Sequence, residues 1–131
     1  MGVVFLIRTE PLRFNYEFSR VFKMGSRLSG RYILLYVFER DARVCRKKKQ
    51  VPHGTNRLGV TASKKVRTAV QRNRIRRLLR ECYRTLEADV KTGYDLIFML
   101  KNMDTPPSFA VLLKDMESLL KRVGAMERAA L

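Results

Sequence analysis

The sequence predicts a single α+β domain, an α/β two-layer structure in which helices alternate with short strands. Two observations predict it. Apolar residues recur at helical spacing in three segments, and between these lie segments rich in aromatic and branched residues. The length of 131 residues fits one domain, and 46% hydrophobic residues suffice for one core. We therefore interpret residues 1–131 as one domain.

The first predicted helix spans residues 15–24. Asn15 is placed to cap it, an apolar stripe follows at positions i, i+3 and i+4, and Gly25 ends it. The stripe consists of Phe18, Val21 and Phe22. On spacing alone, such aromatic residues belong to a core more often than to a ligand site.

Two strands are predicted next, over residues 31–40 and 56–62, because both segments are rich in aromatic and branched residues and are bounded by turn-forming residues. The loop that joins them, residues 41–55, contains four consecutive basic residues at 46–49. It is longer than most hairpin loops, and we interpret it as a basic surface loop.

After residue 62 the period changes to that of a long amphipathic helix, which we expect to begin near Val70 or Gln71 and to be ended by Gly93. Its apolar stripe is Ile75, Leu78, Leu79, Cys82, Tyr83, Leu86 and Val90. Residues just before Val70 lie off this stripe, so they are expected to form a separate turn.

The last predicted elements are a strand over residues 94–101 and a helix that begins after Pro107 and ends at Gly124. The apolar stripe of this helix is Phe109, Leu112, Leu113, Met116, Leu119, Leu120 and Val123. The prediction is thus a sheet of three to four strands combined with three helices.

The chain contains 28 Lys and Arg residues but only 12 Asp and Glu residues, which gives a net charge of +16. Such an excess of positive charge indicates a polyanionic partner. Residues 57–84 contain ten basic residues and one acid, Glu81. A merely solvated helix face usually mixes both signs so that i, i+4 pairs form, whereas here only Glu81 can pair with Arg77 or Arg84. The long helix therefore favours binding of a nucleic acid, and arginine suits phosphate because its planar fork grips two oxygens.

Three ordered segments resemble the protein subunit of bacterial ribonuclease P. They are YEFSRVFKMG at 16–25, RLGVTASKK at 57–65 and AVQRNRIRRLLRE at 69–81, with the tripeptide Arg72-Asn73-Arg74 as the family's hallmark. The resemblance covers about residues 12–124, which leaves residues 1–11 as an arm. The apolar start at 3–7 is unlike the basic arm that is common in the family, and Phe14 stands where a basic or polar residue is usual.

The resemblance implies a subunit that assists an RNA catalyst rather than a protein that cleaves RNA alone. In the family, a catalytic RNA with bound Mg²⁺ removes the 5′ leader of precursor tRNA, and the protein binds both that RNA and the single-stranded leader. The expected partners are therefore the ribonuclease P RNA and precursor tRNA, with no DNA and no membrane. Mg²⁺ is expected to be bound mainly by RNA, with no protein-bound cofactor, in a cytoplasmic enzyme.

Carried over residue by residue, the resemblance implies two binding sites. The contact with the catalytic RNA is expected at Lys64, Lys65, Arg67, Arg72, Asn73, Arg74, Arg76, Arg77 and Arg80. The leader is expected between the first helix and the sheet, at Phe18, Phe22 and Tyr36, with Arg57 nearby. The family fold also implies a mixed, mostly antiparallel sheet and a left-handed crossover through the arginine-rich helix, although right-handed crossovers are the rule.

Other classes of protein fit the sequence less well. The apolar runs are far shorter than the ~20 residues that span a bilayer, and no export signal is visible. Cys45 and Cys82 are far apart and His53 is the only histidine, so no metal set is apparent. The acids are scattered, without the clustered carboxylates or histidine base that hydrolysis by protein would need. A ribosomal or assembly protein that binds structured RNA remains the main alternative, and a lipid-binding basic protein is a third.

Overall fold

The computed structural model describes residues 8–40, 45–46, 49–50, 54–66, 68–101 and 106–126. Its helices are α1 (Asn15–Met24), α2 (Ala69–Leu86) and α3 (Phe109–Val123), with a short 3₁₀ turn η1 (Glu87–Asp89) after α2. Its strands are β1 (Thr9–Pro11), β2 (Ser26–Ser29), β3 (Ile33–Glu39), β4 (Cys45–Arg46), β5 (Lys49–Gln50), β6 (Asn56–Ala62) and β7 (Tyr94–Leu100).

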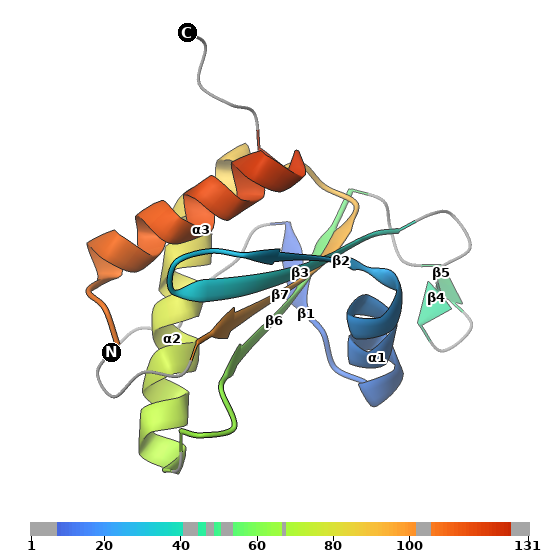
Figure 1. The fold of residues 1–131 in the computed structure, drawn as a ribbon. Coiled ribbons are helices and arrows are strands. Elements are labelled where there is room, and N and C mark those ends of the chain that lie inside the picture. Colours follow the sequence, from blue (N-terminus) through green and yellow to red (C-terminus); the bar gives the residue numbers. More distant parts are fainter. Residues whose placement is uncertain are drawn as a thin grey trace, which may run out of the picture.

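Five strands form one mixed sheet in the order β1-β6-β7-β3-β2, and β4 pairs with β5 as a separate antiparallel ribbon (Figure 1). The pairs β1·β6 and β6·β7 are parallel, whereas β3·β7 and β2·β3 are antiparallel. The α+β class and the mixed sheet are confirmed; the sheet has five strands where three to four were predicted, and two of its four pairs are antiparallel. The edge strands β1 and β2 are three and four residues long and lack an alternating apolar pattern, so sequence reasoning missed both.

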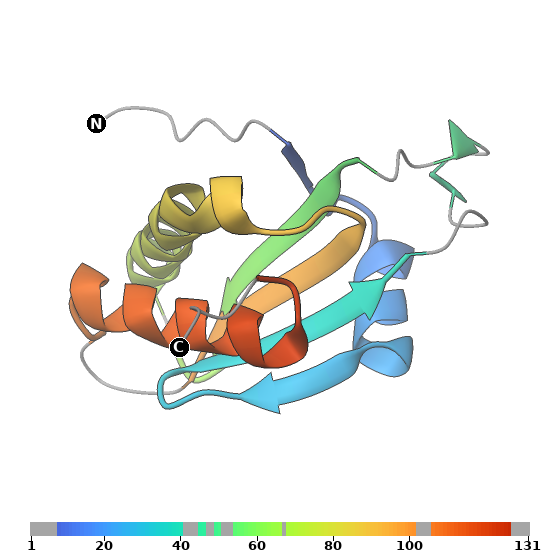
Figure 2. The same ribbon diagram turned by 90° about the horizontal axis from the view of Figure 1, so that it is seen from above.

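Helix α2 connects β6 to its parallel neighbour β7. Figures 1 and 2 together show that this crossover is left-handed, as the resemblance implies. The two strands are in register from Arg57 opposite Asp95 to Ala62 opposite Leu100. This register places the start of α2 beyond the ends of both strands.

The helices cover the two faces of the sheet unequally, with α2 and α3 on one face and α1 on the other (Figure 2). The main core lies under α2 and α3 and is built from alternate strand residues such as Ile33, Leu35 and Phe98. A smaller cluster of Leu12, Val21 and Ile97 lies under α1. The single helix α1 cannot cover the whole of its sheet face, so part of that face is left open.

Local signals explain the helix boundaries. The Thr68 hydroxyl accepts a hydrogen bond from the Gln71 backbone N–H at 3.2 Å, so α2 begins close to the predicted start. Gly124 follows α3 with φ of 84°, a conformation that suits glycine. Asn15 is not the cap that we expected, because it is the first helical residue of α1 and the Glu17 carboxylate accepts the backbone N–H groups before it.

Candidate RNA-binding surface

Helix α2 separates an apolar side from a basic side. Ile75, Leu79, Cys82, Tyr83 and Leu86 are buried in the main core. The arginines on the other side point outward, with Arg74, Arg77, Arg80 and Arg84 exposed and Arg72 and Arg76 half-buried. Glu81 pairs with Arg84 at 3.3 Å, in an exposed ion pair that contributes little stability. We call these six arginines, together with Lys64 and Lys65, the basic face.

The N-terminal end of α2 concentrates positive charge. Its first turn contains no acid, and the partial positive charge of the helix N-terminus adds to that of the side chains. Asn73 and Arg74 are exposed here, as are Lys64 and Lys65 in the preceding turn. The structure thus brings together all the predicted RNA contacts except Arg67, which lies outside the described residues.

Arg72 also supports the fold, which its place in the motif does not reveal. Its Nε donates a hydrogen bond of 2.7 Å to the backbone carbonyl of Val66, a buried residue in the turn before α2. The turn is held further by the Ser63 hydroxyl, which accepts the backbone N–H of Lys65 at 3.3 Å. Arg72 therefore fastens this turn to the first part of the helix.

The interior takes up acidic groups that could otherwise neutralise the surface. Glu17, Glu87 and Asp95 are buried. The Asp115 carboxylate accepts the backbone N–H groups of Arg31, Tyr32 and Ile33 at 2.9 to 3.0 Å, and so ties the turn between β2 and β3 to α3. Because Arg40 and Arg57 are buried as well, the charge of the outer surface stays close to the +16 of the whole chain.

On the α1 side, the strand register arranges side chains in three rows across the sheet. The first row is Arg57, Asp95 and Phe38, the second is Gly59, Ile97, Tyr36 and Arg27, and the third is Thr61, Met99, Leu34 and Ser29. Burial decreases from the first row to the third. Arg57 and Asp95 in the first row are fully buried, whereas Thr61, Met99 and Leu34 in the third row are half-buried. Helix α1 therefore covers one end of this face and leaves the other open. We call the uncovered Leu34, Tyr36, Thr61 and Met99 the open sheet face.

The two predicted leader-binding phenylalanines have different environments. Phe18 is half-buried against Gly59, where an added Cβ would lie 2.7 Å from Phe18 Cε1. Phe22 is 42% exposed and contacts the half-buried Tyr36 edge to face, with ring centroids 4.8 Å apart. Phe18 thus anchors α1 on the sheet, while Phe22 and Tyr36 lie where α1 meets the open sheet face.

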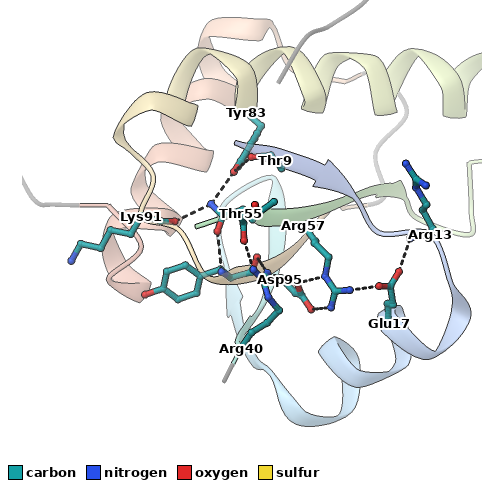
Figure 3. Close-up of polar contacts among 11 residues, drawn as sticks. Thr9, Arg13, Glu17, Arg40, Thr55, Arg57, Tyr83, Lys91 and Asp95 are labelled. Atoms are coloured by element: carbon teal, nitrogen blue, oxygen red, sulfur yellow. Dashed lines mark hydrogen bonds and ion pairs between the residues drawn. The ribbon is translucent and has the colours of Figure 1, made fainter. Parts of the chain in front are cut away.

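Arg57, which was predicted to lie near the leader, is fully buried and makes its contacts within the fold (Figure 3). Its Nε and one terminal nitrogen bond to Asp95 at 2.8 and 2.6 Å, and its other terminal nitrogen pairs with Glu17 of α1. Arg40 joins the network with a 2.8 Å bond to Asp95. Burial alone would lower the pKa of Arg57, but the hydrogen bond and charge of Asp95 and the charge of Glu17 outweigh it and raise the pKa.

This charge network links α1 to β6 and β7. Glu17 also accepts the backbone N–H groups of Arg13 and Phe14 at 2.9 and 3.1 Å, so one carboxylate both caps the helix and pairs with the sheet. Arg57 therefore orients α1, which borders the open sheet face, and its own side chain has no exposed surface there.

Sequence reasoning missed several residues on the α1 side of the sheet. Leu34 and Met99 could have been found, because each alternates with buried residues along a recognised strand. Arg27 could not, because it lies in β2, which carries no strand signal. In the described part of the chain, no three His, Cys, Asp or Glu side chains gather as a metal site would require, and no helix is long and apolar enough to cross a membrane.

Comparisons with known proteins identify one family. The family model described as Ribonuclease P matches residues 6–124. The ribonuclease P protein component of Clostridium botulinum (strain Loch Maree / Type A3) is 35% identical over 119 residues, which cover 90% of this chain and 97% of that protein. That of Thermoanaerobacter sp. (strain X514) is 32% identical over 108 residues, which cover 82% of this chain and 84% of that protein.

Solved structures share the fold. The ribonuclease P protein of Staphylococcus aureus superimposes with a TM-score of 0.71 at 23% identity, covering 89% of this chain and 97% of that one. The Thermotoga maritima protein gives a TM-score of 0.64 at 23% identity, covering 86% and 96%. With a family model and relatives that each span most of its length, the chain belongs to the ribonuclease P protein family.

Proposed function

We propose that this protein serves ribonuclease P by binding two RNAs on different sides of its sheet. The basic face of α2 binds the catalytic RNA. The single-stranded 5′ leader of precursor tRNA binds in a cleft that we infer between α1 and the open sheet face. Family membership supports the role as protein subunit of this tRNA-processing enzyme. We assign each surface to one RNA from the family resemblance, and the charge of α2 and the exposed Phe22 support the assignment.

The basic face has the chemistry of a contact with structured RNA. Its arginines lie along one side of a rigid helix, so they can meet successive phosphates without ordering a loop. Because Glu81 is the only acidic residue of α2, the helix carries a large excess of positive charge. Binding through such a face releases counterions and weakens steeply with added salt.

The leader assignment depends on a single observation, the exposure of Phe22 next to Tyr36 at the uncovered end of the sheet. Proteins that bind single strands with little sequence preference combine aromatic rings, on which bases stack, with a positively charged groove. An RNA-binding protein without a processing role would need only the basic face. The aromatic cleft therefore favours a leader-binding subunit over a ribosomal or assembly protein.

The hydrolytic step belongs to the RNA-based, Mg²⁺-dependent enzyme that defines the family. We infer that Mg²⁺ is bound mainly by RNA, that the protein needs no cofactor of its own, and that it acts in the cytoplasm on tRNA precursors. Its own contribution is positioning, because holding the leader fixes the substrate relative to the catalytic RNA.

The replacement Phe22→Leu tests the leader site. It preserves apolarity and most of the volume, so the fold should survive, but it removes the ring on which a base stacks. We expect the reconstituted holoenzyme to lose about 1–3 kcal/mol of affinity for precursor tRNA with a leader and none for mature tRNA. Equilibrium binding of both tRNAs under non-cleaving conditions measures the difference.

The chain offers a matched control in Phe109→Leu. Phe109 is 39% exposed, close to the 42% of Phe22, but it lies at the start of α3 on the other side of the sheet. This variant should bind both tRNAs as the unaltered protein does. If Phe22→Leu weakens both tRNAs equally, or neither, while the protein remains folded and bound to the catalytic RNA, the leader does not occupy this cleft.

A further inference from the structure

We propose that Arg27 is a phosphate contact for the leader, adjacent to the base that Tyr36 and Phe22 hold. The inference rests on the proposed leader site and extends it to an edge strand. It makes β2 part of the binding surface, in addition to α1 and the central strands.

The register of β2 places Arg27 at the cleft. Arg27 lies directly opposite Tyr36 in the antiparallel pair β2·β3, so both side chains project from the same face of the sheet. The Arg27 guanidinium carbon is 5.9 Å from the centroid of the Tyr36 ring, and Phe22 contacts the same ring edge to face. Phe22, Tyr36 and Arg27 therefore form a continuous series from α1 to the sheet edge.

The guanidinium of Arg27 is free to bind a ligand. The side chain is exposed, and among the described residues it forms no hydrogen bond or ion pair, so its contact is with the Tyr36 ring. The ring contact places the guanidinium beside Tyr36 while its N–H donors remain available. This combination suits one nucleotide, whose base can stack on an aromatic ring while an adjacent phosphate takes the charge-assisted hydrogen bonds.

Arg31 shows that proximity to a ring does not by itself place an arginine in the cleft. Its guanidinium carbon is 5.5 Å from the Tyr32 ring centroid, and its side chain is also exposed. However, Tyr32 packs against the main core, on the face that α2 and α3 cover, and Asp115 of α3 holds this turn. Arg31 therefore carries the same charge and the same type of ring contact at a site away from the leader.

The test compares Arg27→Gln with Arg31→Gln in the reconstituted holoenzyme. For precursor tRNA with a leader, Arg27→Gln should raise Kd by about tenfold, as expected for a charge-assisted hydrogen bond. The slope of log Kd against log salt should also become shallower by about 0.7, which corresponds to one single-strand phosphate. Affinities for mature tRNA and for the catalytic RNA should not change, and Arg31→Gln should leave all three affinities unchanged.

A leader series locates the contact. When the leader is shortened one nucleotide at a time, Arg27→Gln and the unaltered protein should bind equally once the contacted phosphate is gone. Arg27→Lys should keep the salt slope but recover only part of the affinity, because an ammonium group cannot bind a phosphate with a planar fork.

The outcomes separate this inference from the leader site itself. If Phe22→Leu weakens leader binding selectively but Arg27→Gln has no more effect than Arg31→Gln, the Arg27 contact is refuted and the cleft stands. If neither Phe22→Leu nor Arg27→Gln distinguishes precursor from mature tRNA, the leader site is refuted together with it. A loss of affinity with an unchanged salt slope would also overturn the phosphate contact.

Discussion

Replacing Arg57 with methionine should destabilise the protein strongly, although no ligand contact is lost. Arg57, Glu17 and Asp95 have no exposed surface and Arg40 is 3% exposed, so two cations and two anions share one buried network. Arg57→Met preserves much of the side-chain volume but leaves this network with a net negative charge. Removing one partner of a buried ion pair typically costs about 3–5 kcal/mol.

The structure sets the expected value near the lower end of that range, at about 3 kcal/mol. Asp95 would keep its 2.8 Å bond to Arg40, and Glu17 would keep the backbone N–H groups of Arg13 and Phe14. Total stabilities of about 5–15 kcal/mol are usual, so the variant should still fold. Urea unfolding followed by circular dichroism at fixed ionic strength measures the loss.

A double-mutant cycle identifies the cause of the loss. Glu17→Gln alone should cost about 1–3 kcal/mol, because it leaves a buried Arg57 donor without its acceptor. In the Arg57→Met background the same change removes an uncompensated charge, so it should cost less or even stabilise. A loss below about 1 kcal/mol for Arg57→Met, or an equal cost of Glu17→Gln in both backgrounds, would refute the network as the link between α1 and the sheet.

Three further predictions concern the basic face, the α1 contact and the core. Arg74→Ala should weaken binding to the catalytic RNA by about 1–3 kcal/mol without loss of stability. Arg72→Ala should lower both the affinity for this RNA and the free energy of unfolding. Unchanged affinity of both variants in filter binding would exclude both residues from the interface. Gly59→Ala should lower the free energy of unfolding by about 1–3 kcal/mol, because its Cβ would overlap Phe18, and a neutral result in urea would show that α1 adjusts freely. Burial raises the pKa of Cys82 from 9.0 to about 11, so the folded protein holds the thiol proton more tightly than the unfolded chain does. The stability that comes from the neutral thiol is complete below pH 9 and is lost as the pH rises toward 11. Between about pH 8 and pH 10 the unaltered protein should therefore lose about 1–2 kcal/mol more than Cys82→Ala does, and parallel stability profiles would contradict this.

The elements with strong local signals could be predicted from the sequence almost to the residue. The predicted helix over 15–24 and strand over 56–62 match α1 and β6, and α3 ends at Gly124 as expected. Strands β1 and β2 could not be predicted in the same way. Their sequences TEP and SRLS contain no alternation, and each is extended because it pairs with a longer neighbour.

The candidate site could be predicted where basic residues recur at the helical period. It could not be predicted where contacts between distant parts of the chain fix the position of a side chain. The basic face follows from the helical period of α2, which separates its arginines from its apolar stripe. The position of Arg57 depends on Glu17, 40 residues earlier, and on Asp95, 38 residues later, so its burial requires the fold. Likewise, the i, i+4 spacing places Phe18 and Phe22 on one side of α1. Phe22 is exposed because α1 covers only part of its sheet face, and the spacing does not show this.

The central position of β7 in the sheet has a consequence for how the protein is made. This strand pairs with both β6 and β3, yet it follows every other strand of the sheet in the sequence. A nascent chain emerges from the ribosome with its N-terminal end first, so β3 and β6 are exposed before the strand that joins them exists. Because the pairs that β7 makes close long loops, the sheet can assemble only after residue 100 has left the exit tunnel. Assembly of the sheet must therefore await the synthesis of β7, and until then its unpaired strand edges depend on the basic charge of the chain, or on chaperones, to avoid association.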